Sequence, residues 1–217
     1  MKRGDLRDKD IRPALRVFLK RKFSRSAMHA EEVCLGDMAD NYGAIKKQAV
    51  RMDYALINKQ RMIGVEIKSD KDTLGRLPAQ QRYYSYVCDL CAICTTEYHY
   101  FSYHSLCIPE WWGIFIAKRE GKKVVIEEFR KCKPNEFGLR PSVLVNILWK
   151  AELCEFMERH SKHNRRYWDR VCGVESLRTI VSGYFALEKG PAPLAKFVRE
   201  KLVERLEYKK HLAGRYE

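Results

Sequence analysis

The chain of 217 residues has no run near the roughly 18 consecutive apolar residues of a membrane-spanning helix, so we expect no membrane segment. Its first residues, MKRGDLRDKDIR, lack the apolar stretch of a secretory signal peptide. Internal repeats and low-complexity segments are also missing, and 46% hydrophobic residues are enough for a buried core. We therefore expect a folded cytoplasmic protein that makes no contact with a membrane.

Disulfide bonds are not expected either, although the chain contains eight cysteines. Without export the thiols stay reduced, and a buried cysteine behaves as a small apolar residue. The run Cys88-x-x-Cys91-x-x-Cys94 resembles part of an iron–sulfur motif. Strand alternation would send Cys91 and Cys94 to opposite faces, however. Buried structural thiols are the prediction, and whether they bind anything stays open.

Acidic residues are the scarcer charge, with 28 Asp and Glu against 42 Lys and Arg and a net charge of +14. A surface this basic attracts polyanions, nucleic acid above all. A merely soluble basic protein has the same composition, so charge alone does not decide the partner.

The spacing of apolar residues predicts α/β or α+β structure. Helices are expected over residues 10–23, within 28–40, over 73–87 and over 99–106, and strands over 49–57, 62–68, 90–96, 111–118 and 124–129. Residues 133–142 are typical of a loop, and the pattern after them is helical. The predicted organisation is a core over residues 1–132, with its N-terminal helix, and a helical C-terminal region over 142–217.

The hairpin expected from strands 49–57 and 62–68 brings acidic residues together. If Asn58 pairs with Arg61 across a two-residue turn, Asp53 lies opposite Glu66, with Cβ atoms about 5 Å apart. Alternation puts Lys68 on the same face as Glu66. Two facing carboxylates need a positive partner, and Mg²⁺ favours one or two carboxylates with waters and phosphate oxygens. A cross-strand surface salt cluster is the alternative.

These residues carry a resemblance to a known family. Asp53 followed by Glu66-Ile67-Lys68, on a hairpin with a helix after it, resembles the active site of the PD-(D/E)xK nuclease superfamily. That superfamily includes restriction endonucleases, RecB-type exonucleases and Holliday-junction resolvases. Met52 stands where the proline that names the motif is expected, a proline that many members lack.

Further segments strengthen the resemblance, which covers roughly residues 28–118. Gln80-x-x-x-Tyr84 resembles the QxxxY motif of RecB-like branches, and helical spacing puts both side chains on one face. Glu32, or Glu31 in its place, resembles the helix-borne acid that supports the metal site. VEIKSDKDTLGRLPAQ with IPEWWGIFIAK resembles an uncharacterised bacterial and prophage branch.

The resemblance implies a restriction-endonuclease-like mixed central sheet flanked by helices. It also implies a Mg²⁺- or Mn²⁺-dependent nuclease, with DNA favoured over RNA as substrate. The implied metal ligands are Asp53, Glu66, the Ile67 carbonyl and Glu32; the implied catalytic residues are Asp53, Glu66, Lys68, Gln80, Tyr84 and Glu32. The alternative is a catalytically silent nucleic-acid-binding protein, such as a phage or defence accessory factor on the same fold.

The helical tail contains basic residues interleaved with aromatics, SKHNRRYWDR over 161–170. Arg165, Arg166, Tyr167 and Arg170 are the predicted nucleic-acid contacts there. A solvated helix start is the alternative. The sequence is compatible with an oligomer but assigns no interface.

Overall fold

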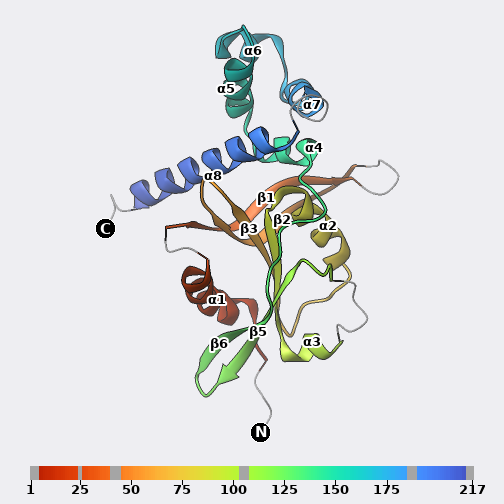
Figure 1. Ribbon diagram of the computed structural model, residues 1–217, viewed down its shortest axis with the longest axis vertical. Coiled ribbons are helices and arrows are strands. Elements are labelled where there is room, and N and C mark those ends of the chain that lie inside the picture. The colour runs from red at the N-terminus through yellow and green to blue at the C-terminus, as the bar shows by residue number, and fades with distance from the viewer. Residues whose placement is uncertain (1–4, 24–25, 40–44, 103–107, 185–189, 214–217) are drawn as a thin grey trace. The chain divides into compact units, whose positions relative to one another are not determined.

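The computed structural model of the protein describes residues 5–23, 26–39, 45–102, 108–184 and 190–213 (Figure 1). The chain forms two compact units. The first comprises Met1–Val33, Met52–Ile57 and Arg61–Phe137, and the second comprises Cys34–Arg51, Asn58–Gln60 and Gly138–Glu217.

A six-stranded mixed sheet runs through the fold in the order β1-β2-β3-β4-β5-β6. The strands are β1 (Met28–Ala39), β2 (Ile45–Ile57), β3 (Met62–Lys68), β4 (Leu90–Thr96), β5 (Gly113–Glu120) and β6 (Lys123–Arg130). β3, β4 and β5 are parallel, whereas β2 is antiparallel to β3 and β6 is antiparallel to β5. Every residue of β3 and β4 is buried, as central parallel strands with both faces covered require. Helices flank the sheet, so the predicted α/β class is confirmed.

One helix covers each face of the sheet in the first unit (Figure 1). α1 (Asp8–Lys22) buries Ile11, Leu15 and Leu19, spaced by four residues along one stripe, against the β3–β5 face that carries Phe115. α2 (Leu77–Val87) covers the opposite face, where Leu77 packs with residues of β4 and β5. α2 begins four residues later than predicted, with proline in its first turn, where a missing N–H costs nothing.

The helical turns predicted within residues 28–40 are wrong, because this segment is strand β1. Ala27, Ala30 and Val33 are buried at intervals of three, which imitates a helix. Between Ala30 and Val33, both Glu31 and Glu32 are exposed, and Glu32 has a left-handed φ of 53°. Such a backbone irregularity, as in a β-bulge, shifts strand alternation by one residue.

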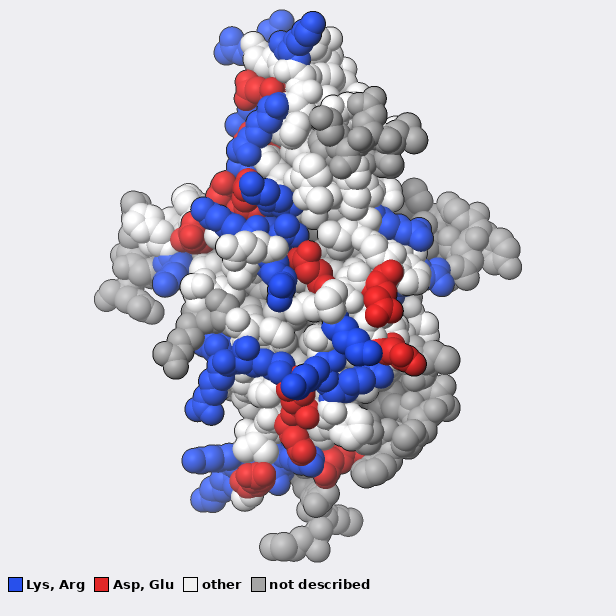
Figure 2. All heavy atoms as spheres, in the orientation of Figure 1, with Lys and Arg blue, Asp and Glu red and all other residues white. Residues whose placement is uncertain are grey.

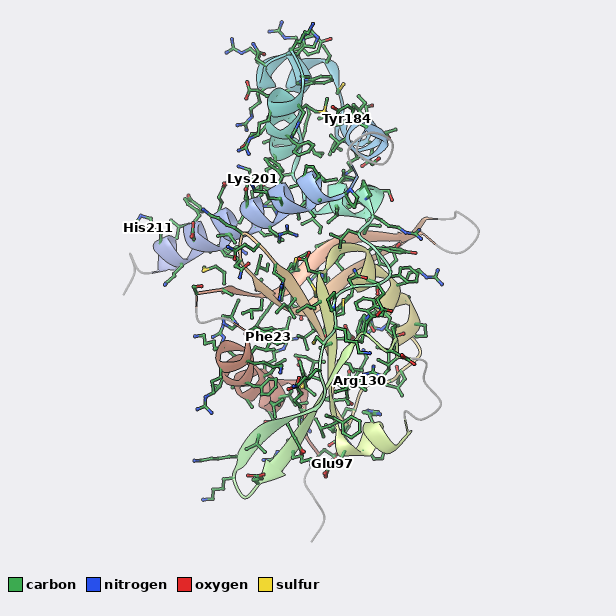
Figure 3. All side chains as sticks on the ribbon, in the orientation of Figure 1. Phe23, Glu97, Arg130, Tyr184, Lys201 and His211 are labelled. Atoms are coloured by element: carbon green, nitrogen blue, oxygen red, sulfur yellow. The ribbon has the colours of Figure 1, made fainter. Side chains whose placement is uncertain are left out.

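The β2–β3 hairpin has the predicted register. Pairs run from Tyr54–Val65 to Ile57–Met62, as pairing of Asn58 with Arg61 requires. β6 ends at Arg130, which is labelled in Figure 3. Its guanidinium donates to the carbonyls of Trp112 and Pro109 in the segment that leads into β5. A short helix, α3 (Glu97–Ser102), follows β4 and starts two residues before its predicted position.

The C-terminal region is helical, as predicted. It contains α4 (Pro141–Leu144), a 3₁₀ turn (Val145–Ile147), α5 (Lys150–His160), α6 (Arg165–Val171), α7 (Val174–Tyr184) and α8 (Ala192–Ala213). Lys201 of α8 pairs with Glu155 of α5 at 2.8 Å and with Glu204 at 2.7 Å (Figure 3). None of the helices in the described ranges is long and apolar enough to cross a membrane.

Candidate active site

Asp53 lies on β2 one residue beyond the last recorded pair of the hairpin. Its carboxylate Oδ2 accepts the Ile67 N–H at 2.8 Å, and its own N–H donates to the Tyr84 hydroxyl at 2.9 Å. At Ile67 of β3, the backbone N–H is therefore bound by the Asp53 side chain and not by a backbone carbonyl of β2. This brings the Asp53 carboxylate to the backbone between Glu66 and Lys68.

Glu66 and Lys68 form a buried ion pair beside it, with 2.5 Å between Oε1 and Nζ. The Glu66 side chain is fully buried and that of Lys68 is only 4% exposed. α2 supplies the remaining partners: the Tyr84 hydroxyl donates to Glu66 Oε2 at 2.5 Å, and Lys68 Nζ donates to Gln80 Oε1 at 3.1 Å. The structure thus brings together five residues that the sequence singled out.

Burial dominates the electrostatics of the cluster. The pKa of Asp53 is raised from 3.8 to about 7, first by burial and second by the neighbouring Glu66 carboxylate, against smaller opposing effects of the Ile67 N–H and Lys68. Lys68 already neutralises Glu66 at contact distance. When Asp53 is ionised, the buried cluster therefore carries one net negative charge.

The donor atoms fit a hard divalent cation. Asp53 and Glu66 offer carboxylate oxygens, and Asp53 Oδ1 accepts no hydrogen bond from a described residue. No group of three or more His, Cys, Asp or Glu side chains suited to a metal occurs in the described ranges. Two carboxylates with the remaining positions left to water and phosphate oxygens is the arrangement that Mg²⁺ favours. The carbonyl of Ile67 was the predicted ligand, whereas the contact that Ile67 makes in this site is the hydrogen bond from its N–H to Asp53.

Tight packing fixes Tyr84. The Tyr84 ring stacks on Trp112 at 5.9 Å, and burial raises the pKa of its hydroxyl well above the usual value. A Cβ at Gly64 would lie 2.6 Å from Met52 Sδ and 2.7 Å from Cys88 Sγ, so β3 has no room for a side chain there. The Tyr84 hydroxyl can therefore hold Asp53 and Glu66 in one arrangement.

Arg12 of α1 is a site residue that the sequence reasoning missed. Its guanidinium donates to the Asp53 carbonyl at 2.9 Å and to Glu32 Oε1 at 2.9 Å, and its Nε donates to Asp8 at 2.8 Å. The pattern of α1 gave only a basic outer face, and nothing in it separates Arg12 from its neighbours. Only the tertiary contact with β2 identifies it.

Glu32 reaches the neighbourhood of Asp53 through Arg12, but it lies on strand β1 and not on a helix as expected. Its side chain is 49% exposed, and its charge raises the pKa of Asp53 slightly. Glu31, the alternative, contacts Arg12 at 3.4 Å and Arg16 at 3.9 Å. Both acids therefore bind arginines of α1.

Cys91 and Cys94 of strand β4 lie on opposite faces of the sheet, as strand alternation predicted. Cys88, Cys91 and Cys94 are buried free thiols. Cys94 packs in the core beneath α1, whereas Cys91 lies with Cys88 on the other face. Burial raises the pKa of both strand thiols, which makes them poor metal ligands and nucleophiles.

Arg165, Arg166, Tyr167 and Arg170 all lie on α6, in the second unit. No residue of this helix is buried. Figure 2 shows Lys and Arg side chains gathered along α5 and α6, at the top of the view.

Comparison with known proteins gives one family. The family model described as bacteriophage P4 protein cII matches residues 6–186. No curated protein matches the chain. A solved structure of a protein of unknown function from Silicibacter pomeroyi is similar to it with 13% identity and a TM-score of 0.35, covering 72% of this chain and 91% of that one. This structural likeness is too low to support an inference.

Proposed function

The chain belongs to the bacteriophage P4 protein cII family, and we propose that this member is a metal-dependent nuclease acting on DNA. The active site consists of Asp53, Glu66 and Lys68, with Gln80 and Tyr84 as supporting residues. This is the activity implied by the sequence resemblance to PD-(D/E)xK nucleases.

One observation carries the proposal: two carboxylates and an ammonium group are buried together, with one carboxylate left over. The Glu66–Lys68 pair at 2.5 Å is self-neutralising, whereas Asp53 has a pKa of about 7 because it is desolvated beside Glu66. A purely structural cluster would gain stability by losing that surplus acid. A site that exchanges a proton for a divalent cation needs it.

Asp53 and Glu66 would hold the cation, which supplies Lewis acidity and positive charge to the phosphate. Lys68 holds the attacking water by a hydrogen bond and adds positive charge beside the phosphate oxygens. Gln80 keeps the Lys68 ammonium in place through the 3.1 Å contact. Tyr84 fixes the Glu66 carboxylate, so the oxygen donors need no rearrangement when substrate arrives.

A cleavage panel tests the proposal. Purified protein is incubated with single-stranded, nicked, branched and duplex DNA and with RNA, with Mg²⁺, Mn²⁺ or EDTA. Metal-dependent cutting of at least one DNA form is expected. Asp53→Asn and Lys68→Ala should abolish it, and Lys71→Ala, which removes a lysine whose side chain is 62% exposed, should not.

The variants also separate catalysis from folding. Asn keeps the size of Asp53 and resembles its protonated form, so Asp53→Asn should melt close to the wild type. Full activity in both site variants would overturn the assignment. Metal-independent binding of DNA with no cutting of any substrate would favour the silent nucleic-acid-binding alternative.

A further inference from the structure

α6 is a helix that the fold presents to solvent. It is held by polar contacts: Asn164 caps it by accepting the Tyr167 N–H at 2.9 Å, and Trp168 Nε1 donates to Ser161 Oγ at 3.0 Å. Lys150 of α5 pairs with Asp169 at 2.9 Å. Because none of its residues is buried, its aromatic and basic side chains are not explained by a hydrophobic core.

The aromatic side chains of this segment are already stacked. The His163 and Tyr167 rings lie 4.0 Å apart at 16°, and Trp168 meets both edge-on, at 5.9 Å and 5.4 Å. Tyr167 is nonetheless 42% exposed. An exposed, preorganised ring stack offers π-faces at low entropic cost, which is what binding an unpaired base requires.

Positive charge exceeds negative charge around the stack. Residues 161–172 contain Lys162, Arg165, Arg166 and Arg170 against a single acid, Asp169, which Lys150 already engages. Arg166 and Arg170 are one helical turn apart, and neither makes an ion pair or side-chain hydrogen bond with a described residue. Such repulsion costs stability unless a polyanion relieves it.

A hollow lies beside these arginines. Its volume is about 400 Å³, and it is lined by Ala151, Cys154, Arg165, Arg166 and Asp169. Arg165 and Arg166 at one hollow suit a phosphate oxygen, which arginine binds in bidentate fashion. The Asp169 carboxylate in the same lining is already paired with Lys150. Ring faces and phosphate-binding cations therefore occur within one short segment.

We propose that the surface formed by His163, Tyr167, Trp168, Arg166 and Arg170 binds single-stranded DNA, with bases stacking on the rings and phosphates on the arginines. Duplex DNA hides its base faces and would use only the arginines. The acceptors beside the rings, Asn164 Oδ1 and Ser161 Oγ, are occupied by the contacts given above. The helix cap and the indole contact thus engage both of these atoms, and neither is held free for the 2′-hydroxyl of RNA.

The test is a binding titration that needs no catalysis. Fluorescence anisotropy of a labelled oligothymidylate of about 15 nucleotides is recorded with the full-length Lys68→Ala protein in EDTA. Tyr167→Ala should raise the Kd about fivefold or more, and Tyr167→Phe should restore it. The matched control is Tyr208→Ala, which removes a tyrosine of the same unit that is 65% exposed.

The arginines have a separate readout. The slope of log Kd against the logarithm of the salt concentration measures the number of phosphate contacts. Replacing both Arg166 and Arg170 by Ala should lower this slope by about 1.4, because each lost phosphate contact accounts for about 0.7. Arg178→Ala, in which the lost arginine is paired with Glu175, should leave it unchanged.

The proposal is overturned if Tyr167→Ala and Tyr208→Ala weaken binding equally, or if duplex DNA or single-stranded RNA of the same length binds as tightly as the oligothymidylate. Since cleavage is absent from the assay, a failure here leaves the proposed nuclease site untouched. Loss of the nuclease proposal likewise leaves this binding surface standing.

Discussion

Glu66 and Lys68 are two residues apart on β3, and their side chains form an ion pair at 2.5 Å that is almost completely buried. Removing two charges from water costs several kcal/mol per ion, and the Tyr84 and Gln80 hydrogen bonds offset part of that cost. Buried polar groups arranged this way are more typical of a functional site than of a stability device.

Tyr84→Phe tests the hydroxyl that joins Asp53 to Glu66. The substitution leaves a buried Glu66 oxygen without its donor and the Asp53 N–H without its acceptor. We expect a loss of about 1–3 kcal/mol in the free energy of unfolding by urea titration. Cleavage should fall about 10- to 100-fold. Tyr83→Phe, on the same helix but only partly buried, is the control, and equal effects of the two changes would argue against a special role of Tyr84.

Arg12→Ala tests whether α1 supports the site. The guanidinium contacts the Asp53 carbonyl and three acidic side chains, so its loss should cost about 2 kcal/mol of stability. Cleavage should also fall, because Asp53 loses a fixed backbone position. Arg12→Lys should recover little, since one ammonium group cannot make the four contacts. An Arg12→Ala protein as active and stable as the wild type would contradict this role.

Gly64→Ala should destabilise the fold by about 1–3 kcal/mol through overpacking. The new methyl group would meet Met52 Sδ and Cys88 Sγ at 2.6 and 2.7 Å. Thermal melting measures the effect. Gly75→Ala, where a Cβ would meet nothing within 4 Å, is the matched control, and we expect no loss there. Similar melting temperatures for both variants would show that β3 packs more loosely than described.

The pH dependence of stability follows from Asp53. Its pKa is about 7 in the folded protein against an ordinary 3.8, so between these values the folded state binds more protons than the unfolded state. Stability from this group is thus complete below about pH 4 and is lost as pH rises through 7. In urea titrations with EDTA, Asp53→Asn should show a flatter decline from pH 5 to 8. A parallel decline in both proteins would refute the assigned pKa.

Much of the candidate site could be read from local sequence. The alternation around Asp53 and Glu66, the two-residue turn and the helix carrying Gln80 and Tyr84 are all short-range signals, and the hairpin register agreed with its prediction. Placement of Asp53 between Glu66 and Lys68 needs the Ile67 hydrogen bond as well, which alternation alone does not reveal.

The failures have physical reasons. Glu32 was expected on a helix from the family resemblance, but its left-handed φ of 53° lies within strand β1. Arg12 was not recognised, since its four partners come from residues 8, 31, 32 and 53 and meet only in the tertiary fold. His163 was overlooked because ring stacking across a helix N-terminus has no sequence signature.

Calorimetric titration of the wild-type protein with Mn²⁺ tests the central claim most directly, because it asks whether Asp53 exchanges a proton for a cation. At pH 6, in buffers of different ionisation enthalpy, binding of one Mn²⁺ should release close to one proton, and Asp53→Asn should bind far more weakly with no such release. Mn²⁺ binding that is equally tight in both proteins, or no binding to the wild type at all, would contradict the account.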